Sequence, residues 1–144
     1  MYMPIWVLYW FPFFLMPNIA VKAGLFLLPL LICKVLMRNP KILTAGSIIR
    51  GWCFVMGSEM AGLFTFYVIE MKLGLTDYFY YSHYAQVSAL ALGISVSLNC
   101  LLNFFFSFKW NEVSVRQRAL TSLFVAATTA PYLFLLDSGW PFLE

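Results

Sequence analysis

Residues 84–107 read YAQVSALALGISVSLNCLLNFFFS, a mostly apolar stretch without a charged side chain. A helix needs about 20 mostly apolar residues to cross the hydrocarbon core of a bilayer. Two further stretches approach this length and composition, GWCFVMGSEMAGLFTFYVIE at 51–70 and ALTSLFVAATTAPYLFLL at 119–136. The pattern therefore predicts three transmembrane helices after residue 50.

The first 40 residues predict a fourth span at about 19–38. Lys22 and Lys34 flank its apolar centre and can extend toward the lipid headgroups, and Pro29 is expected to kink the helix. The preceding segment 2–16 is rich in Trp, Tyr and Phe and is interrupted by prolines. Since Trp and Tyr favour the headgroup layer, we expect an interfacial or re-entrant segment there. A fifth, short span is the alternative.

The overall composition supports the same class of protein. Of the 144 residues, 62% are hydrophobic and 10% are charged, whereas a soluble domain has about 25% charged residues. We therefore expect one integral membrane domain over 1–144: an all-α membrane protein with about four transmembrane helices in a compact bundle. The net charge of +3 is dispersed, so nucleic-acid binding is not expected.

The positive-inside rule predicts the orientation of this bundle, because Lys and Arg accumulate in loops that stay on the cytoplasmic side. Two connections are basic, and their residues are Lys34, Arg38, Lys41 and Arg50 in one and Lys109, Arg116 and Arg118 in the other. The loops 38–50 and 109–118 should thus face the cytoplasm of a bacterial inner membrane, or the matrix of a mitochondrial inner membrane. The 71–82 loop should face outward.

Small residues spaced four apart predict where the helices pack against one another, since they let backbones approach closely in lipid. The series Ala85, Ala89, Gly93 and Ser97 lies on one helix, and Ser122, Ala126 and Ala130 lie on another. Shorter series pair Gly57 with Ala61 and Ser58 with Gly62. We expect these faces to point into the bundle.

Three polar residues should lie at similar depth inside the bilayer, Glu59, Asn99 and Thr128, and Asn103 should lie one turn below Asn99 on the same face. Glu59 is the one ionisable residue near the middle of a clean span, so it should be protonated or hydrogen-bonded. Ser95 and Thr129 can join this cluster. One interpretation is a polar patch that handles a lipid headgroup or a proton, and the favoured one is hydrogen bonding that holds the helices together.

The sequence contains no recognisable catalytic or metal motif. It has one histidine, which excludes a site with several histidine ligands, and the three cysteines, Cys33, Cys53 and Cys100, form no C-x-x-C pair. G-x-S-x-G, H-E-x-x-H and phosphate-loop motifs are absent. We therefore expect no enzyme activity, no metal and no cofactor.

Residues 50–110 resemble half of a GtrA-type membrane protein. Arg50-Gly-Trp-Cys-Phe-Val-Met-Gly57 is similar to the opening of that family's hairpin unit, and Asn103-Phe-Phe-Phe-Ser-Phe-Lys109-Trp110 to its closing motif, with Glu59 near its acidic or polar position. The family's basic pair after the Asn is replaced here by phenylalanines, and the second unit lacks its return helix.

The resemblance implies a protein that moves or presents a polyprenyl-phosphate-linked sugar beside a glycosyltransferase. Arg50 and Lys109 would then contact phosphate at the cytoplasmic face, and Glu59 and Asn103 would line the route. Membrane lipids and other membrane subunits are the further expected partners. Two alternatives stay open: a structural subunit of a respiratory or ATP-synthase-type complex, and a small channel or transporter.

Overall fold

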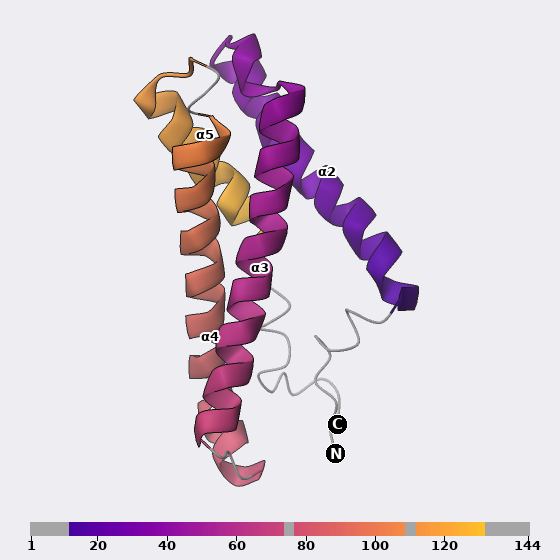
Figure 1. Cartoon of the computed structure of the whole chain (residues 1–144), viewed down its shortest axis with the longest axis vertical. Coiled ribbons are helices and arrows are strands. Elements are labelled where there is room, and N and C mark those ends of the chain that lie inside the picture. Colours follow the sequence, from indigo (N-terminus) through magenta and orange to yellow (C-terminus); the bar gives the residue numbers. More distant parts are fainter. Residues whose placement is uncertain (1–11, 74–76, 109–111, 132–144) are drawn as a thin grey trace.

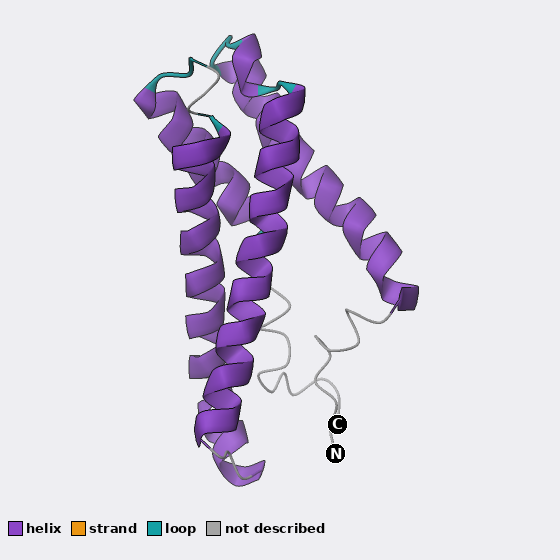
Figure 2. Ribbon diagram, in the orientation of Figure 1, coloured by secondary structure: helices purple, strands orange, loops and turns teal. Residues whose placement is uncertain are grey.

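The computed structural model describes residues 12–73, 77–108 and 112–131, and this part of the chain is helical without a strand (Figures 1 and 2). The all-α prediction is confirmed for it. The elements are α2 (Pro12–Leu36), the short 3-10 turn η1 (Pro40–Ile42), α3 (Ala45–Leu73), α4 (Asp77–Leu102), the π-helical turn η2 (Asn103–Ser107) and α5 (Val115–Thr128).

Helices α3 and α4 lie side by side along the long axis of the molecule (Figure 1). Helix α5 packs against both α4 and α2, whereas α2 leans away from α3 toward its own first residues (Figure 1). The end of α2, the start of α3, the turn η2 and the start of α5 meet at one end of the bundle (Figure 1). We call this end, which holds the loops predicted to be basic, the basic end.

Two helix starts at the basic end have identifiable side-chain caps. Ser114 and Gln117 form a capping box, in which each side chain accepts a hydrogen bond from the other residue's backbone N–H. Before α3, the Thr44 hydroxyl oxygen accepts from the Ser47 N–H at 3.2 Å, and the buried Ser47 hydroxyl lies 2.9 Å from the Ile42 carbonyl oxygen. The bonds donated by backbone N–H groups satisfy donors that the helix starts leave open, and together these bonds fix where α3 and α5 begin.

The helices begin earlier than the predicted spans do. α2 starts at Pro12 rather than near residue 19 and continues through Pro29, so residues 12–16 of the predicted interfacial or re-entrant segment are helical. Residues 1–11 lie outside the described part, and a fifth span there stays a prediction. α3 starts at Ala45, which places Arg50 inside the helix rather than at its mouth.

The last two predicted spans differ in how well their ends agree with the structure. The 84–107 prediction ends where η2 ends, at Ser107. Helix α5 begins before the predicted 119–136 span and ends at Thr128, while residues 132–136 are not among those described. Pro131 lacks an N–H and disfavours helix in the residue before it, which accounts for an end near this point.

Two stretches within the described residues are long and apolar enough to cross a membrane, Ile19–Leu36 and Gln86–Ser107. The other helices do not combine both properties. α5 has only 14 residues, and the 29 residues of α3 include Arg50, Glu59 and Lys72. Length and composition thus support two of the four predicted spans, and the other two stay predictions.

The main apolar cluster lies toward the basic end. It contains Phe26, Leu30 and Cys33 of α2, Ile42, Val55, Phe108, Val113 and Val125. A smaller cluster of Phe66, Val87 and Ala91 joins α3 to α4 farther along the bundle. Apolar packing therefore joins α2, α3, α5 and the residue that follows η2 in the main cluster, and α3 and α4 in the smaller one.

The small-residue faces are only partly as predicted. Ser122, Ala126 and Ala130 of α5 are buried, as are Ser58 and Gly62 of α3. On α4 the prediction is wrong, because Ala89, Gly93 and Ser97 are exposed and the buried face carries Ser88, Ala91, Ser95, Asn99 and Asn103 instead. α4 turns polar side chains, rather than only small ones, toward its neighbours.

Candidate functional site

A ladder of hydrogen bonds runs along the buried face of α4 into η2. The Asn103 amide nitrogen donates to the Asn99 side-chain oxygen at 2.6 Å and to the Asn99 carbonyl at 3.0 Å. The Ser107 hydroxyl donates to the Asn103 side-chain oxygen at 2.7 Å. All three residues are buried and four positions apart, so each side chain reaches the next turn of the same helix.

The ladder continues to α5 through Thr129. The Asn99 amide nitrogen donates to the Thr129 hydroxyl oxygen at 3.0 Å, and that hydroxyl donates to the Val125 carbonyl at 2.8 Å. Thr128, the predicted member of the cluster, is half-buried, and its hydroxyl contacts only carbonyls of its own helix, those of Phe124 and Val125. The residue of α5 that contacts Asn99 is therefore Thr129, the neighbour of the predicted Thr128.

Asn103 is closely packed on the side that faces α3. Gly51 is buried, and a Cβ at this glycine would lie 2.7 Å from the Phe26 ring and 3.0 Å from the Asn103 side-chain oxygen. The Phe26 ring in turn packs edge-on against Trp52, with centroids 5.8 Å apart. Asn103 therefore sits in a filled core and bonds within its own α4–η2 segment, so its geometry does not favour a route for a ligand.

Arg50 closes the carboxyl end of the α4–η2 segment. Its Nη2 lies 3.4 Å from the Ser107 carbonyl oxygen, one of the carbonyls that a helix end leaves without a partner. The Arg50 Nε is buried and has no hydrogen-bond partner among the described residues, and Arg50 forms no ion pair with any of them. The half-buried guanidinium thus keeps donors for a further acceptor. Lys109, its predicted companion, lies outside the described residues.

Arg118 is a second half-buried arginine beside the same turn, and it was not singled out as a site residue from the sequence. Its guanidinium carbon lies 5.3 Å from the centre of the Phe104 ring, within the range of a cation–π contact. Its Nε is also buried without a partner among the described residues. Arg50 approaches η2 from α3 and Arg118 from α5.

Glu59 does not belong to the asparagine ladder in the described contacts; it pairs with Lys22 across α2 and α3. The Lys22 ammonium donates to the Glu59 Oε2, and both residues are buried, at 6% and 3% exposure. Lys22 was expected to extend toward the headgroups, and this is wrong, because its side chain turns inward to a carboxylate. Glu59 Oε1 is buried and has no hydrogen-bond partner among the described residues.

The two loops predicted to share one side of the membrane are bonded to each other. The Asn39 amide donates to the Gln117 side-chain oxygen at 3.1 Å, and the Gln117 amide reaches the Met37 carbonyl at 3.5 Å. Lys41 and Glu112 form an exposed ion pair between the same loops, and the Lys41 ammonium lowers the pKa of the Glu112 carboxyl below its usual value of 4.5. The basic end is therefore one connected surface.

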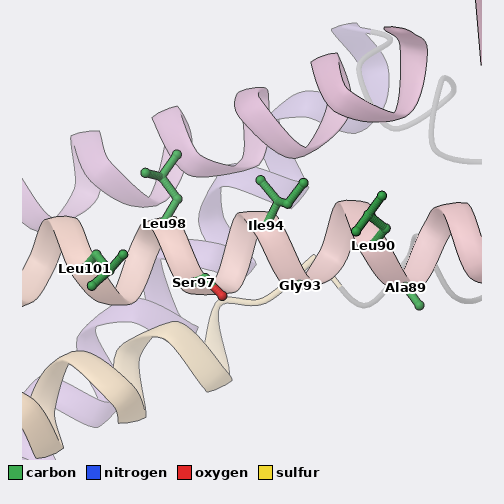
Figure 3. Close-up of a pocket in the computed structure, with 7 residues that line it drawn as sticks. All are labelled: Ala89, Leu90, Gly93, Ile94, Ser97, Leu98 and Leu101. Atoms are coloured by element: carbon green, nitrogen blue, oxygen red, sulfur yellow. The ribbon is translucent and has the colours of Figure 1, made fainter. Parts of the chain in front are cut away.

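An open apolar groove follows the exposed face of α4 (Figure 3). Its floor carries the small residues Ala89, Gly93 and Ser97, and its sides carry Leu90, Ile94, Leu98 and Leu101. Figure 3 shows all of these residues on one helix, α4. Such a surface in lipid allows another helix to approach closely.

No group of three or more His, Cys, Asp or Glu side chains that could hold a metal ion occurs within residues 12–73, 77–108 and 112–131. Comparison with known proteins gives no match. No family model matches the sequence, and neither a curated protein nor a solved structure does.

Proposed function

We propose that this chain is an integral membrane protein whose basic end lies at the cytoplasmic or matrix face. Support comes from the two apolar helical stretches and from large exposed apolar side chains on α2 and α4, among them Val21, Leu28, Leu90 and Leu101. Contiguous apolar surface of this kind is costly in water. In lipid it costs nothing, and the hydrogen-bonded interior then holds the helices together.

We propose that the basic end binds the phosphate of a lipid-linked sugar. The observation that carries this is Arg50, whose guanidinium is half-buried, forms no ion pair with the described residues and keeps an unpartnered Nε. A guanidinium of this kind matches the paired oxygens of a phosphate. The resemblance of residues 50–110 to a GtrA-type protein supports a polyprenyl-phosphate-linked sugar as ligand. The protein would work without catalysis of its own, beside a glycosyltransferase.

The substitution Arg50→Gln tests this function. It should reduce sugar transfer to the outer leaflet about 10- to 100-fold, because a hydrogen bond to a charged group contributes about 1.5–3 kcal/mol. Arg50→Lys keeps the charge but not the paired donors of the guanidinium. Its sugar transfer should lie between those of wild type and Arg50→Gln. Arg116→Gln is the matched control, since Arg116 is exposed at the same end. Unchanged transfer in Arg50→Gln, at normal protein level, would contradict the proposal.

A subunit role in a larger membrane complex is the second candidate. The exposed series Ala89, Gly93 and Ser97 favours it, because this groove would admit a transmembrane helix of another subunit. Gly93→Leu should release the chain from its complex in gentle detergent, measured by native mass spectrometry. Gly24→Leu, at an exposed glycine of α2 with open space around it, should leave assembly unchanged. Equal behaviour of the two variants would remove this candidate.

A further inference from the structure

The buried face of α2 changes from apolar to charged along the helix. Toward the basic end it carries Phe26, Leu30 and Cys33, which belong to the main apolar cluster. One turn before Phe26 the same face carries Lys22, which is buried and pairs with Glu59 of α3. Apolar packing therefore anchors the second half of α2, whereas an ion pair joins its first half to α3.

The first half of α2 has little packing among the described side chains. Between Ile19 and Leu25, Lys22 is the buried residue, while Ile19, Val21 and Leu25 are exposed. Figure 1 shows that α2 leans away from α3 in this half. A movement of this half relative to α3 would therefore disturb few of the described contacts besides the ion pair.

A point where the helix can bend lies between the ion pair and the apolar anchor. Pro29 has no N–H, so the Leu25 carbonyl, four positions earlier, lacks its usual helical donor. Gly24 precedes this carbonyl, and a Cβ there would meet nothing within 4 Å, so close packing does not require a glycine. Glycine and proline are the residues at which helices bend. α2 can thus bend between Lys22 and Phe26 while the main cluster stays packed.

The ion pair lies far from the basic end and nearer the opposite membrane surface. Lys22 precedes the last residue of α2, Leu36, by 14 positions, and Glu59 follows the first residue of α3, Ala45, by 14 positions. At a rise of about 1.5 Å per residue, each is about 21 Å along its helix. In a hydrocarbon core about 30 Å thick, about 10 Å remain to the opposite headgroups. The long lysine stem and a small outward movement of the helix can cover this distance.

We propose that Lys22 and Glu59 form a proton-operated latch that fixes the first half of α2 to α3. The carboxylate takes up a proton from water at Oε1, which is buried and has no hydrogen-bond partner among the described residues. Lys22 keeps its charge but loses its counter-ion, and an uncompensated charge inside the bilayer is strongly unfavourable. The ammonium then moves to the headgroup layer opposite the basic end, and the first half of α2 swings outward about Gly24.

The charged group that the described contacts place on Glu59 is Lys22. Helix α4 packs on another side of α3, and its described buried face carries uncharged polar side chains such as Ser95 and Asn99. Cys100 is the one titratable side chain within residues 86–107. On α2, α3 and α5 the other titratable groups with described side chains lie nearer the basic end or several turns beyond Glu59: Cys33, Lys34, Arg50, Cys53, Lys72, Arg116 and Arg118. Neutralising Glu59 therefore acts first on Lys22.

The test measures the distance between two spin labels by pulsed electron resonance on the full chain in lipid nanodiscs. In a background without native cysteines, Val21→Cys on α2 and Met60→Cys on α3 carry the labels, since both residues are exposed. Their distance should increase by at least about 5 Å, one helix pitch, between about pH 8 and about pH 4, which spans the ordinary titration of a carboxyl group. Labels at Val35→Cys and Ile49→Cys, exposed at the basic end, are the control pair and should keep their distance.

Two variants assign the response to the ion pair. Glu59→Gln imitates the protonated carboxyl, so the Val21–Met60 distance should already be long at about pH 8. Lys22→Met removes the charge that has to leave the interior, so its distance should not respond to pH. The control pair reports whether each variant keeps the basic end folded, and wild type and Lys22→Met decide the question even where Glu59→Gln fails to fold.

A constant Val21–Met60 distance in wild type across this pH range would overturn the latch. A wild-type response in Lys22→Met would overturn it as well, and an equal increase in both label pairs would show general unfolding by acid instead. A short distance in folded Glu59→Gln would mean that the pair does not hold α2. The latch uses the membrane placement proposed above but not the ligand. Its failure therefore leaves the role of Arg50 standing, and unchanged sugar transfer in Arg50→Gln leaves the latch standing.

Discussion

Gly51 of α3 faces Asn103 of η2 so closely that a Cβ on the glycine would lie 3.0 Å from the asparagine side-chain oxygen. The same Cβ would lie 2.7 Å from the buried Phe26 ring of α2. One residue without a side chain thus permits three elements to meet. The contact also explains why the polar ladder on α4 can be buried against α3.

Gly51→Ala should destabilise the protein by about 1–3 kcal/mol, the usual cost of overpacking a filled core. Neither the Phe26 ring nor the bonded Asn103 amide can move away without disturbing its own contacts. The midpoint of thermal unfolding in detergent measures the effect. Gly57→Ala is the control, because a Cβ there meets nothing within 4 Å; it should be neutral or stabilising by up to about 1 kcal/mol. Equal midpoints for the two variants would contradict the close contact.

Thr129→Val should weaken the attachment of α5 to α4, whereas Thr128→Val should not. Valine removes the oxygen that accepts from the Asn99 amide and leaves that buried donor unpaired, at a cost of about 1–2 kcal/mol. Thr128 bonds only to carbonyls of its own helix. Unfolding in detergent again provides the measurement. A larger effect at Thr128 would mean that the ladder does not reach α5 in this way.

Acidification should release the link between the two loops of the basic end. The pKa of Glu112 is lowered by Lys41, so the contribution of the pair is complete above the ordinary value of 4.5 and is lost as the pH falls through the lower, folded value. NMR titration of the Glu112 carboxyl should give a pKa below that of the Lys41→Met variant. The effect on unfolding should be small, since both side chains are exposed. An unchanged pKa in Lys41→Met would exclude the ion pair.

Single cysteines placed in the two loops should be labelled from the same side of the membrane. The bonds of Asn39 with Gln117 and of Lys41 with Glu112 hold these loops together. In a background without Cys33, Cys53 and Cys100, Ala45→Cys and Ser114→Cys should react with a membrane-impermeant maleimide only in inside-out vesicles. Lys72→Cys, exposed near the other end of α3, should react only in right-side-out vesicles. Opposite labelling of the two loop cysteines would refute the arrangement.

The sequence predicted the helical class and the approximate helix positions, and it predicted one side of the membrane for the two basic loops that the structure joins. These features follow from the composition and charge of long stretches of residues, which can be counted in the sequence itself. It also located Asn99 and Asn103 in the interior, because the amides of two asparagines four apart on an apolar helix find hydrogen-bond partners there and not among apolar surroundings. The end of η2 at Ser107 was predicted from the change in composition after that residue.

Side-chain partners were harder to predict, because they depend on how each helix is rotated. The α4 small-residue face turned outward since Ser95, Asn99 and Asn103 compete for the inward side and cost more when left in lipid. Lys22 was predicted to extend toward the headgroups because it lies near the end of a span. In the structure its ammonium pairs instead with a carboxylate on another helix. The sequence does contain a signal for the Lys22–Glu59 pair. Two neighbouring spans each carry one charged residue, and the two residues lie at the same distance from the loop between the spans.

The meeting of α2 with α5, described with the fold, bears on how the chain is assembled during synthesis. The α3–α4 hairpin is contiguous in sequence and packs along its length, so it can form as soon as both helices leave the ribosome. α2 is made earlier, yet it packs more on α5 than on α3. α2 is therefore complete before its larger partner α5 exists, and a ribosome paused before residue 115 would leave α2 with only its contacts to α3, such as that of Phe26 with Trp52.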